Sequence, residues 1–553
     1  MSVAERSYLL TVTRTLAVLS SARAPEWASL RLLAALDTVD GPDETLSASV
    51  HVEDDGRVVV ERQSTVWDEA TVTLVPQDDG VEIRTRVAGR GRLTDVHLLA
   101  GRSLMADAPT GFLPSGSRFR RRFSPNPGYT PQLAAAGESA VIGVTGDGEP
   151  GRGRWFFTPA PLFLAFETED DWVGLGVAAP VDELTFTQLE YRPAEIGFSL
   201  ALAYEGHTEV DGEFSAPTVI LTTGLPEPYA GLPRHREHLA ARRAAPPPRA
   251  RPRPAWWSEP IFCGWGAQCA RATSEGGSAK DLATQANYDG YLEHLEQNGL
   301  VPGTITIDDK WQGAYGTCRP DPEKWPDIRG WIASRRARGQ HVLLWWKAWD
   351  PEGLPPELCI RNPRGEPVAV DPTNPDARDA LRATVTEMLA PDGLDADGLK
   401  IDFTARTPSG AALTTHGPGW GIALLHDLLD IVYRAAKDAK PDALVVTHTP
   451  HPAFVDVTDM IRLNDIVRTD EGVVALMRHR ADVSRCACPE LLVDTDDWPM
   501  PDLAEWRAYL DAKSSLGVPA LYYTDSVDGT GETFTADDYE ALRRSWSTWR
   551  SAR

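Results

Sequence analysis

The sequence predicts two folded units, an N-terminal β-sandwich followed by a (β/α)8 TIM barrel. Three observations support this prediction. Short apolar runs of alternating pattern fill the first part of the 553-residue chain, a segment rich in proline and arginine follows, and strand-like runs then alternate with helical stretches. We place the sandwich at residues 1–232, a Pro/Arg-rich linker at residues 233–256 and the barrel at residues 257–553.

The pattern before residue 232 indicates an antiparallel β-sandwich. Apolar and polar residues alternate along Leu46–Val52, Arg57–Val60, Val81–Val87 and Pro217–Leu221, and Gly, Asp and Pro residues separate these runs. Such alternation is typical of strands with one buried face. The segment Ala244–Pro254 is too rich in proline for a helix or a central strand, and we expect it to run extended between the two units.

Strands and helices alternate after Trp256. The eight candidate strands are Ile261–Trp265, Thr304–Asp309, His341–Trp346, Gly398–Asp402, Ala443–His448, Met460–Asp465, Glu490–Asp494 and Ala520–Tyr523. Helices are predicted at Leu282–Asn298, Trp325–Arg338, Pro375–Leu389, Gly421–Lys437, Leu503–Leu516 and after the capping box that begins at Thr535. Eight strands in such a series predict a (β/α)8 barrel. The alternative is a doubly wound sheet, but no glycine-rich phosphate loop follows the first strand.

Composition narrows the classes of function. The formal net charge of −25 disfavours nucleic acid, which binds basic surfaces. No run approaches the ~18 apolar residues of a membrane span, and the run Tyr8–Leu19 contains Arg14 and favours a strand over a signal peptide. The six cysteines lack Cys-x-x-Cys spacing, which indicates reduced thiols in a cytoplasmic protein rather than disulfides or a metal site. The composition is compatible with an oligomer.

Polar residues gather where the predicted barrel strands end. The C-terminal ends of the strands carry the chemistry in (β/α)8 barrels, although we expect many of these residues to cap helices instead. The residues are Asp308, Asp309, Lys347, Lys400, Asp402, His448, His451, Arg462, Asp465, Asp494, Asp496, Asp497 and Asp525.

Lys400 and Asp402 are the most informative pair among these residues. Side chains two positions apart on a strand point to the same side, so the sequence places an ammonium group beside a carboxylate. A neighbouring cation keeps a carboxyl group ionised, as a nucleophile that attacks an anomeric carbon must be. A surface ion pair would give the same Lys-x-Asp pattern, and the motifs around the pair decide between the two interpretations.

Motifs at four strands resemble those of clan D retaining α-glycosidases, which comprise glycoside hydrolase families 27, 31 and 36. These motifs are Gly264-Trp265 at the first strand, Ile307–Trp311 at the second, Leu399–Asp402 at the fourth and Arg462–Ile466 at the sixth. Asp371–Arg378 is similar to the Asp-x-Thr-Asn-Pro-x-Ala-Arg signature that leads into the fourth unit of those barrels. The preceding β-sandwich is similar to that of family 36, so the α-galactosidases and raffinose synthase-like proteins of that family are the nearest group.

The resemblance implies that Asp402 is the nucleophile and Asp465 the acid/base. The acid needs a raised pKa, and the change of Asp402 from anion to ester shifts the pKa of its partner in the useful direction. Many relatives place the acid/base four residues after the arginine, whereas Asp465 lies three residues after Arg462. Asp470, two residues after Arg468, therefore stays an alternative.

The resemblance also implies a set of sugar-binding residues. Asp308 and Asp309 would bind hydroxyls at the far side of the ring if the chain turns after the strand, and Lys400 would bind hydroxyls beside the nucleophile. Arg462 would bind the hydroxyl next to the anomeric carbon, and Trp265 would form a wall of the pocket. Indole faces suit sugar rings, and we expect the set to be completed by Trp311, Trp346 and His448.

These residues predict a retaining, exo-acting α-glycosidase that hydrolyses α-galactosides, or closely related α-glycosides, by double displacement. One alternative is a transglycosylase of the raffinose synthase-like type, in which an acceptor sugar competes with water. The others are α-glucosidase-like specificity and a carbohydrate-binding protein without catalysis. The expected partner is a small oligosaccharide or glycoside, and none of these functions needs a metal ion or an organic cofactor.

Overall fold

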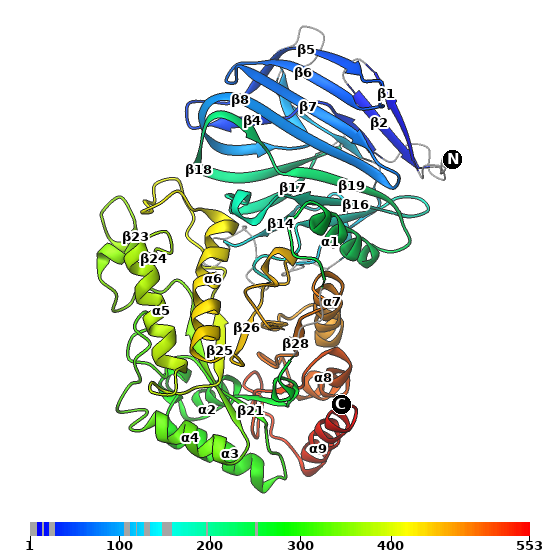
Figure 1. The fold of residues 1–553 in the computed structure, drawn as a ribbon. Coiled ribbons are helices and arrows are strands. Elements are labelled where there is room, and N and C mark those ends of the chain that lie inside the picture. The colour runs from blue at the N-terminus through cyan, green and yellow to red at the C-terminus, as the bar shows by residue number, and fades with distance from the viewer. Residues whose placement is uncertain are drawn as a thin grey trace.

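A β-sandwich is stacked on a (β/α)8 barrel in the computed structural model of the protein (Figure 1), which confirms the predicted fold class. The structure describes residues 8–13, 16–21, 28–103, 111–117, 119–126, 133–145, 157–194, 197–248 and 253–553. Within these ranges no helix combines the length and the apolar character that crossing a membrane requires.

The sandwich is organised around two long strands, β8 (Gly80–His97) and β18 (Gly197–Ser215). β8 pairs with β7 (Glu69–Pro76) and β19 (Thr218–Leu225) near its start and with β18 along the rest of its length. The strands that precede β8 and the later strands β18 and β19 are thus joined through β8. The other strands are β1 (Tyr8–Val12), β2 (Leu16–Ser21), β3 (Ala28–Arg31), β4 (Ala35–Thr38), β5 (Glu44–Val52), β6 (Val58–Ser64), β9 (Ala100–Ser103), β10 (Gly111–Pro114), β11 (Gly116–Ser117), β12 (Arg121–Phe123), β13 (Leu133–Ala135), β14 (Ala140–Gly143), β15 (Phe163–Glu167), β16 (Trp172–Ala178) and β17 (Gln188–Ala194).

Helix α1 (Gly231–Ala241) occupies the first part of the segment that the sequence predicts as a linker. Its buried residues Leu232, His235, Arg236 and Leu239 recur at helical spacing, and the helix packs between the sandwich and barrel helix α7 (Gly472–Ala487). A helix therefore forms within the predicted linker, because this buried stripe has surfaces on both sides against which to pack. Residues 249–252 of the proline-rich part lie outside the described residues.

Eight parallel strands form the barrel in the order β20–β21–β22–β25–β26–β27–β28–β29. The N–H of Val518, before β29, donates to the carbonyl of Val493 in β28 at 2.7 Å and closes the ring. Most strands end earlier than predicted because the residues at their predicted ends turn away into loops or, at Trp265, begin a helix. The bounds are β20 (Ile261–Cys263), β21 (Thr304–Ile307), β22 (His341–Lys347), β25 (Gly398–Asp402), β26 (Leu444–Thr447), β27 (Met460–Arg462), β28 (Leu492–Asp494) and β29 (Ala520–Leu521).

Helices cover the outside of the barrel, and a small hairpin is inserted before the fourth strand of the barrel. The helices are α2 (Trp265–Glu275), α3 (Gln285–Gln297), α4 (Ile328–Ala337), α5 (Pro375–Leu389), α6 (Gly421–Ala439), α7 (Gly472–Ala487), α8 (Leu503–Leu516) and α9 (Ala536–Ser551), and the hairpin consists of β23 (Cys359–Arg361) and β24 (Pro367–Val370). The predicted capping box of α9 is confirmed. Helices α2 and α7 were not predicted, and the prediction of Trp265 as a strand residue was wrong because this residue opens α2.

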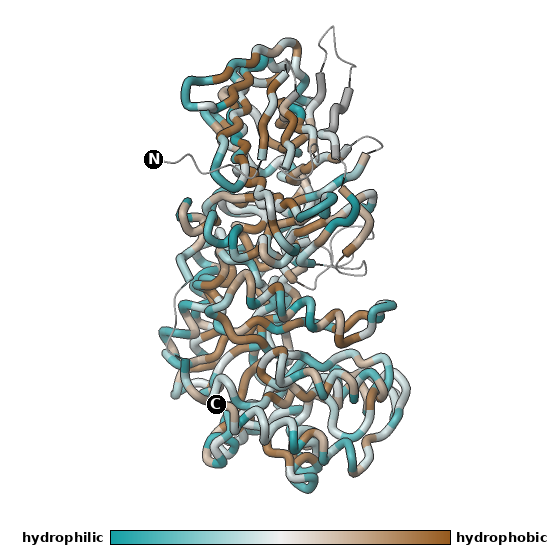
Figure 2. The backbone as a smooth tube through the Cα atoms, turned by 90° about the vertical axis from the view of Figure 1, so that its right-hand side faces the viewer, coloured by the Kyte–Doolittle hydropathy of each residue, from teal (hydrophilic) through white to brown (hydrophobic). Residues whose placement is uncertain are grey.

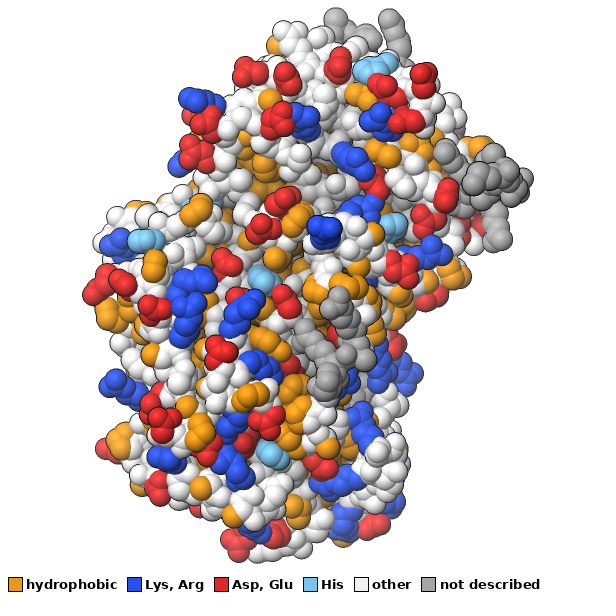
Figure 3. Space-filling model, in the orientation of Figure 1, with side chains coloured by type: hydrophobic (Ala, Val, Ile, Leu, Met, Phe, Trp, Pro, Cys, Tyr) orange, Lys and Arg blue, Asp and Glu red, His pale blue; other side chains and the backbone are white. Residues whose placement is uncertain are grey.

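The sandwich packs against the C-terminal ends of β25 and β26. The N–H of Thr158 donates to the carbonyl of His448 after β26 at 3.0 Å, and the N–H of Ile422 in α6 donates to the carbonyl of Phe186 at 3.0 Å. Figure 2 shows apolar segments running through the interior of both units. Acidic and basic side chains are interspersed over the face drawn in Figure 3. The sandwich thus borders the end of the barrel where a catalytic site is expected.

Candidate active site

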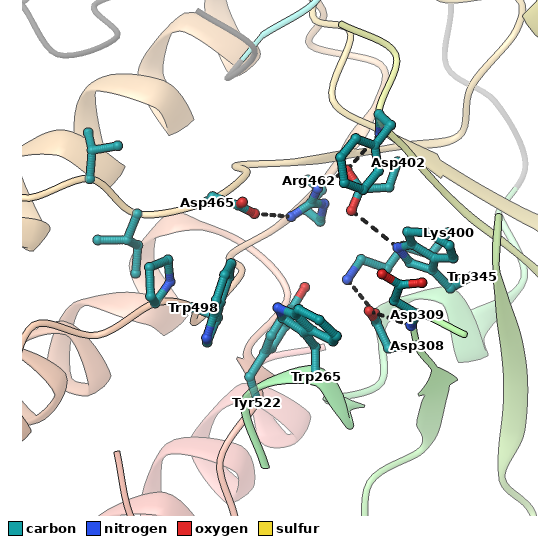
Figure 4. Close-up of a pocket in the computed structure, with 14 residues that line it drawn as sticks. Trp265, Asp308, Asp309, Trp345, Lys400, Asp402, Arg462, Asp465, Trp498 and Tyr522 are labelled. Carbon is teal, nitrogen blue, oxygen red and sulfur yellow. Dashed lines mark hydrogen bonds and ion pairs between the residues drawn. The ribbon is translucent and has the colours of Figure 1, made fainter. Parts of the chain in front are cut away.

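A cavity of about 280 Å³ opens at the C-terminal ends of the barrel strands (Figure 4). Its size is near the lower end of the ~300–1,000 Å³ range of small-molecule pockets. Acidic, basic and aromatic side chains line it. The lining residues are Trp265, Asp308, Asp309, Trp345, Lys400, Asp402, Phe403, Arg462, Asp465, Ile466, Val467, Trp498, Pro499 and Tyr522.

Asp402 ends strand β25 and lines this cavity. Nη2 of Arg462 donates to its Oδ1 at 2.9 Å, and the N–H of Phe403 donates to the same oxygen at 2.8 Å. The indole N–H of Trp345 donates to Oδ2 at 3.1 Å. Burial opposes ionisation of this carboxyl group, but the charge of Arg462 outweighs burial and lowers the pKa of Asp402 below its usual range. Asp402 is therefore an anion at neutral pH.

Lys400 does not pair with Asp402, which corrects the pairing expected from the sequence. Its ammonium donates to Oδ2 of Asp308 at 2.7 Å and to the sulfur of Cys263 at 3.4 Å. Burial opposes the charge of Lys400, but the Asp308 carboxylate outweighs burial and raises the pKa of Lys400. Lys400 and Asp402 do share the inner face of β25, yet the curvature of the barrel gives each a closer partner on another strand.

The chain turns directly after β21, and both Asp308 and Asp309 reach the cavity. Lys310 makes the turn with a φ of 72°, in the left-handed region. The N–H of Asp308 donates to the hydroxyl of Tyr288 at 2.8 Å. A Cβ at Gly264 would lie 2.2 Å from that hydroxyl oxygen, so only glycine leaves room for this contact.

Asp309 lies among cations and a phenol at one end of the cavity. The hydroxyl of Tyr315 donates to its Oδ1 at 2.8 Å, and Nζ of Lys280 is 3.7 Å from Oδ2. Burial raises the pKa of Asp309 to about 6; the bond from Tyr315 opposes this shift and the charge of Asp308 adds to it. Asp309 is thus poised to lose or gain a proton in the weakly acidic range.

Arg462 lies between three carboxyl groups and is 1% exposed. Nη1 donates to Asp465 at 3.1 Å and to Asp496 at 2.6 Å, while Nη2 donates to Asp402 at 2.9 Å. Asp496 is itself fixed by the N–H groups of Asp497, at 2.6 Å, and Trp498, at 3.1 Å. One guanidinium therefore joins the candidate nucleophile to the candidate acid/base.

Asp465, and not Asp470, lies in the cavity. Nη1 of Arg480 donates to the carbonyls of Leu463, Asn464 and Asp465 at 2.8–3.0 Å, which fixes the loop that carries Asp465. Burial raises the pKa of Asp465, and the charge of Asp402 adds to this shift although Arg462 opposes it. Asp470 is exposed and does not line the cavity.

Three residues of the predicted sugar-binding set do not line the cavity. Trp311 is buried, with its indole N–H donating to the carbonyl of Trp345 at 2.8 Å. Trp346 was predicted to line the cavity, but its neighbour Trp345 does so instead. Side chains alternate along β22, and Trp345 lies on the inner face of the barrel. Nε2 of His448 is 2.6 Å from the hydroxyl of Thr404, and burial lowers its pKa to about 3, so this buried histidine is neutral at pH 7.

Several lining residues were missed by the sequence prediction. Trp345 is in register with Lys400 of the neighbouring strand, so alternation along β22 could have revealed it. Tyr522 directly follows β29. Trp498, whose ring meets that of Trp265 edge to face at 5.6 Å, carries no recognisable pattern, and neither does Phe403.

The arrangement supplies two carboxyl groups with opposite properties. Asp402 is held ionised, whereas the raised pKa of Asp465 suits a group that carries a proton, and this difference is the usual mark of a nucleophile and a general acid. Asp308, Asp309 and Lys400 offer hydrogen-bonding groups for hydroxyls at the other end of the cavity. In the part of the chain that the structure describes, no group of three or more His, Cys, Asp or Glu residues could hold a metal ion.

Comparison with known proteins finds relatives in fold only. No protein-family model and no curated protein matches the chain. The α-galactosidase TtGalA from Thermus thermophilus, solved with stachyose, is 15% identical, with a TM-score of 0.54 over 90% of this chain and 99% of that one. A GH31 family sulfoquinovosidase from E. rectale is 12% identical, with a TM-score of 0.60 over 97% of this chain and 82% of that one.

A third structure, the cycloalternan-forming enzyme from Listeria monocytogenes, is 11% identical and has a TM-score of 0.55. The alignment covers 97% of this chain but 56% of the Listeria chain, so this protein spans about half the length of that enzyme. At such low identities the three likenesses show that the fold is shared, and the assignment of a function must come from the site itself.

Proposed function

We propose that the protein is a retaining, exo-acting α-glycosidase whose substrates are α-galactosides or closely related α-glycosides. The observation that carries the proposal is the placement of Asp402 and Asp465 on one guanidinium, with their pKa values shifted in opposite directions. Retaining glycosidases need such a pair on opposite sides of the bond that breaks. The structural likeness to an α-galactosidase and to a GH31 sulfoquinovosidase is consistent with it.

The reaction proceeds in two steps. The Asp402 carboxylate attacks the anomeric carbon, the bond from that carbon to the glycosidic oxygen breaks, and Asp465 gives its proton to the departing oxygen. Water then attacks the anomeric carbon of the glycosyl ester, passes a proton to Asp465 and restores the Asp402 carboxylate. Two inversions at the same carbon leave the product with the α configuration of the substrate.

The buried polar end of the cavity supports exo action. Asp308, Asp309 and Lys400 are each at most 5% exposed, and they would bind the hydroxyls at the non-reducing end of one sugar ring. A group that donates or accepts inside such a pocket rejects sugars that lack the matching hydroxyl. Nη2 of Arg462 has a second N–H besides the one bonded to Asp402, and we assign it to the hydroxyl next to the anomeric carbon.

A panel of p-nitrophenyl α- and β-glycosides tests the proposal. We expect the α-galactoside to be hydrolysed, or the α-glucoside if the specificity is glucosidase-like, while the β-anomers stay intact. Asp402→Ala should remove turnover, and azide should restore part of it and yield a β-glycosyl azide. Asp470→Ala is the matched control and should keep wild-type activity. Hydrolysis of β-glycosides, or no hydrolysis of any α-glycoside, would contradict the proposal.

A further inference from the structure

The cavity has two ends that differ in chemistry. Figure 4 shows Asp308, Asp309 and Lys400 on one side of Arg462, and Asp465 and Trp498 on the other. The polar end offers carboxylates and an ammonium group. The apolar lining residues Ile466, Val467 and Pro499 directly follow Asp465 and Trp498 in the chain, so we assign them, with Trp498, to the end that holds Asp465.

This apolar end is where the leaving group must lie if the proposed function is correct. The general acid has to reach the glycosidic oxygen, so the group that departs with that oxygen lies beside Asp465. Ile466 and Val467 follow Asp465 directly in the chain and are 3% and 7% exposed. The N–H of Ile466 donates to the carbonyl of Trp498 at 2.9 Å, which joins both halves of the apolar end into one wall.

The side chains of this wall offer nothing that could bind the hydroxyls of a second sugar. Ile466, Val467 and Pro499 have no polar side-chain atoms, and the indole N–H of Trp498 already donates to Asp528 at 2.8 Å. The hydroxyls of a sugar placed here would lose hydrogen bonds to water without replacement from these four side chains, which is unfavourable, and contact with the face of Trp498 does not supply those bonds. An alkyl or aryl group would instead gain from the removal of its apolar surface from water.

We infer that the natural substrate is an α-glycoside with an apolar leaving group, an alkyl or aryl alcohol, rather than an oligosaccharide. This inference rests on the proposed function and specifies the substrate class of the same site. It assigns the polar end to the sugar and the wall of Ile466, Val467, Trp498 and Pro499 to the apolar alcohol.

Three substrates with one sugar test the inference. The first is an α-glycosyl fluoride, galactosyl or glucosyl, whichever is hydrolysed faster; its leaving group is too small to reach the wall. The second carries cyclohexylmethanol, and the third is the 1→6-linked disaccharide that releases glucose. Both of these leave as primary alcohols, so their chemical reactivity is similar and the difference reports binding at the apolar end.

We expect kcat/KM of the wild-type protein for the cyclohexylmethyl glycoside to exceed that for the disaccharide by at least about tenfold, because apolar pockets discriminate by roughly 10–200-fold for small apolar changes. Equal values, or a preference for the disaccharide, would overturn the inference and leave the proposed function intact. If neither fluoride is hydrolysed, the proposed function itself fails. The two failures are thus distinguishable.

Val467→Thr places a hydroxyl group in the wall with little change in volume, and Ile466→Thr places one there by replacing an ethyl group, which also shortens the side chain by one carbon. Each should lower the ratio of the two kcat/KM values several-fold, with fluoride hydrolysis as the reference for active enzyme. Val301→Thr makes the same change at a surface position that is 47% exposed and should leave the ratio unaltered. Unaltered ratios in both wall variants would overturn the inference. If a variant does not fold, the wild-type preference for the cyclohexylmethyl glycoside over the disaccharide remains the test of the inference.

Discussion

Arg462 controls the charge of two residues that need opposite protonation states. It faces Asp402 and Asp465, and the buried Asp496 carboxylate balances part of its charge at 2.6 Å. The negative charge of Asp496 helps to raise the pKa of Asp465. Asp496 is thus a positioning residue, since it acts on the acid/base through Arg462 and through the local field rather than by touching the substrate.

Replacing Asp496 by Asn should shift the pH dependence of catalysis. Loss of the charge leaves Arg462 to act more strongly on Asp465, so the pKa of Asp465 falls and its proton is lost at lower pH. We expect the alkaline limb of the kcat/KM profile for a p-nitrophenyl α-glycoside to move down by roughly half to one pH unit. Asp470→Asn, at an exposed position, is the control. A fall in activity without a shift of the limb would indicate a purely structural role.

The wild-type protein should show a bell-shaped dependence of kcat/KM on pH. The acidic limb reports protonation of Asp402, whose lowered pKa moves this limb below the usual carboxylate range, and the alkaline limb reports loss of the proton from Asp465. Asp465→Ala should lose the alkaline limb. It should also retain far more activity on an α-glycosyl fluoride, which needs no proton to leave, than on an alkyl glycoside. An unchanged alkaline limb in this variant would assign the acid to another group.

At the scale of single elements, the sequence predicts best where a start signal is local. The bounds of α5 and α8 agree with prediction because Asn374, followed by Pro375, and Asp502 accept N–H groups at the first turns. Helices α2 and α7 were missed, and neither Gly264 nor Glu471 makes a side-chain cap; α6 also lacks one at Trp420, yet its long apolar stripe at helical spacing allowed its prediction. A helix without a local start signal depends on tertiary packing, which a single sequence does not reveal.

In the candidate site, too, the sequence predicts features that are set locally but not those that depend on tertiary contacts. The strand-end position of polar residues follows from the alternation of strands and helices, and it placed Asp402 and Asp465, which line the cavity, among the thirteen candidates; the family resemblance singled them out. Which groups become partners is decided across the barrel, so local spacing predicted a Lys400–Asp402 pair where the structure has Arg462 beside Asp402. The choice between Trp345 and Trp346 likewise needs the orientation of β22.

Asp397 anchors the start of β25, the strand that carries the nucleophile. Its Oδ2 accepts the N–H of Val342 at 2.9 Å, and Arg336 and Lys440 contact Oδ1 at 3.0 and 3.3 Å. Burial opposes ionisation, but these groups and His341 outweigh burial and lower the pKa of Asp397 from 3.8 to about 2.

Because the folded pKa of Asp397 is lowered, its contribution to stability is present above pH 4 and is lost as the pH falls toward 2. Asp397→Asn should lower the free energy of unfolding by about 2 kcal/mol at pH 7, and the difference from wild type should narrow at pH 3. Urea denaturation at both pH values measures it. Asp392→Asn, at an exposed position, should change stability by less than ~0.5 kcal/mol. A pH-independent difference would show that lost packing, not charge, is responsible.

At the scale of the whole molecule, the sandwich and the barrel meet at the start of α6. Gly421 has a φ of 61°, and a Cβ there would lie 2.1 Å from the carbonyl oxygen of Phe186 in the sandwich. Thr158 hydrogen-bonds Thr404 two residues after Asp402, so the sandwich also supports the loop beside the nucleophile. Docking of the two units is therefore linked to the geometry of the site.

Gly421→Ala should disturb this docking. The added methyl group clashes with the backbone of the sandwich and occupies an unfavourable φ, so we expect a loss of at least ~1–3 kcal/mol in a thermal unfolding experiment. Gly290→Ala is the matched control: it lies in α3 with no atom within 4 Å of the new Cβ and should stabilise by up to about 1 kcal/mol. Equal stability of Gly421→Ala and wild type would show that the close approach of Gly421 to Phe186 does not limit docking.

Asp402 is the proposed nucleophile, and trapping of the glycosyl-enzyme identifies the residue that forms the covalent bond to the sugar. The protein is treated with a 5-fluoro-α-glycosyl fluoride, denatured and digested with trypsin, which cuts after Lys400 and Arg406 and releases the peptide Ile401–Arg406. Asp402 is the one acidic side chain of this peptide. We expect the mass of one fluorinated sugar to appear on Ile401–Arg406. An adduct on any other peptide, or turnover without an adduct and with inversion of the anomeric carbon, would contradict it.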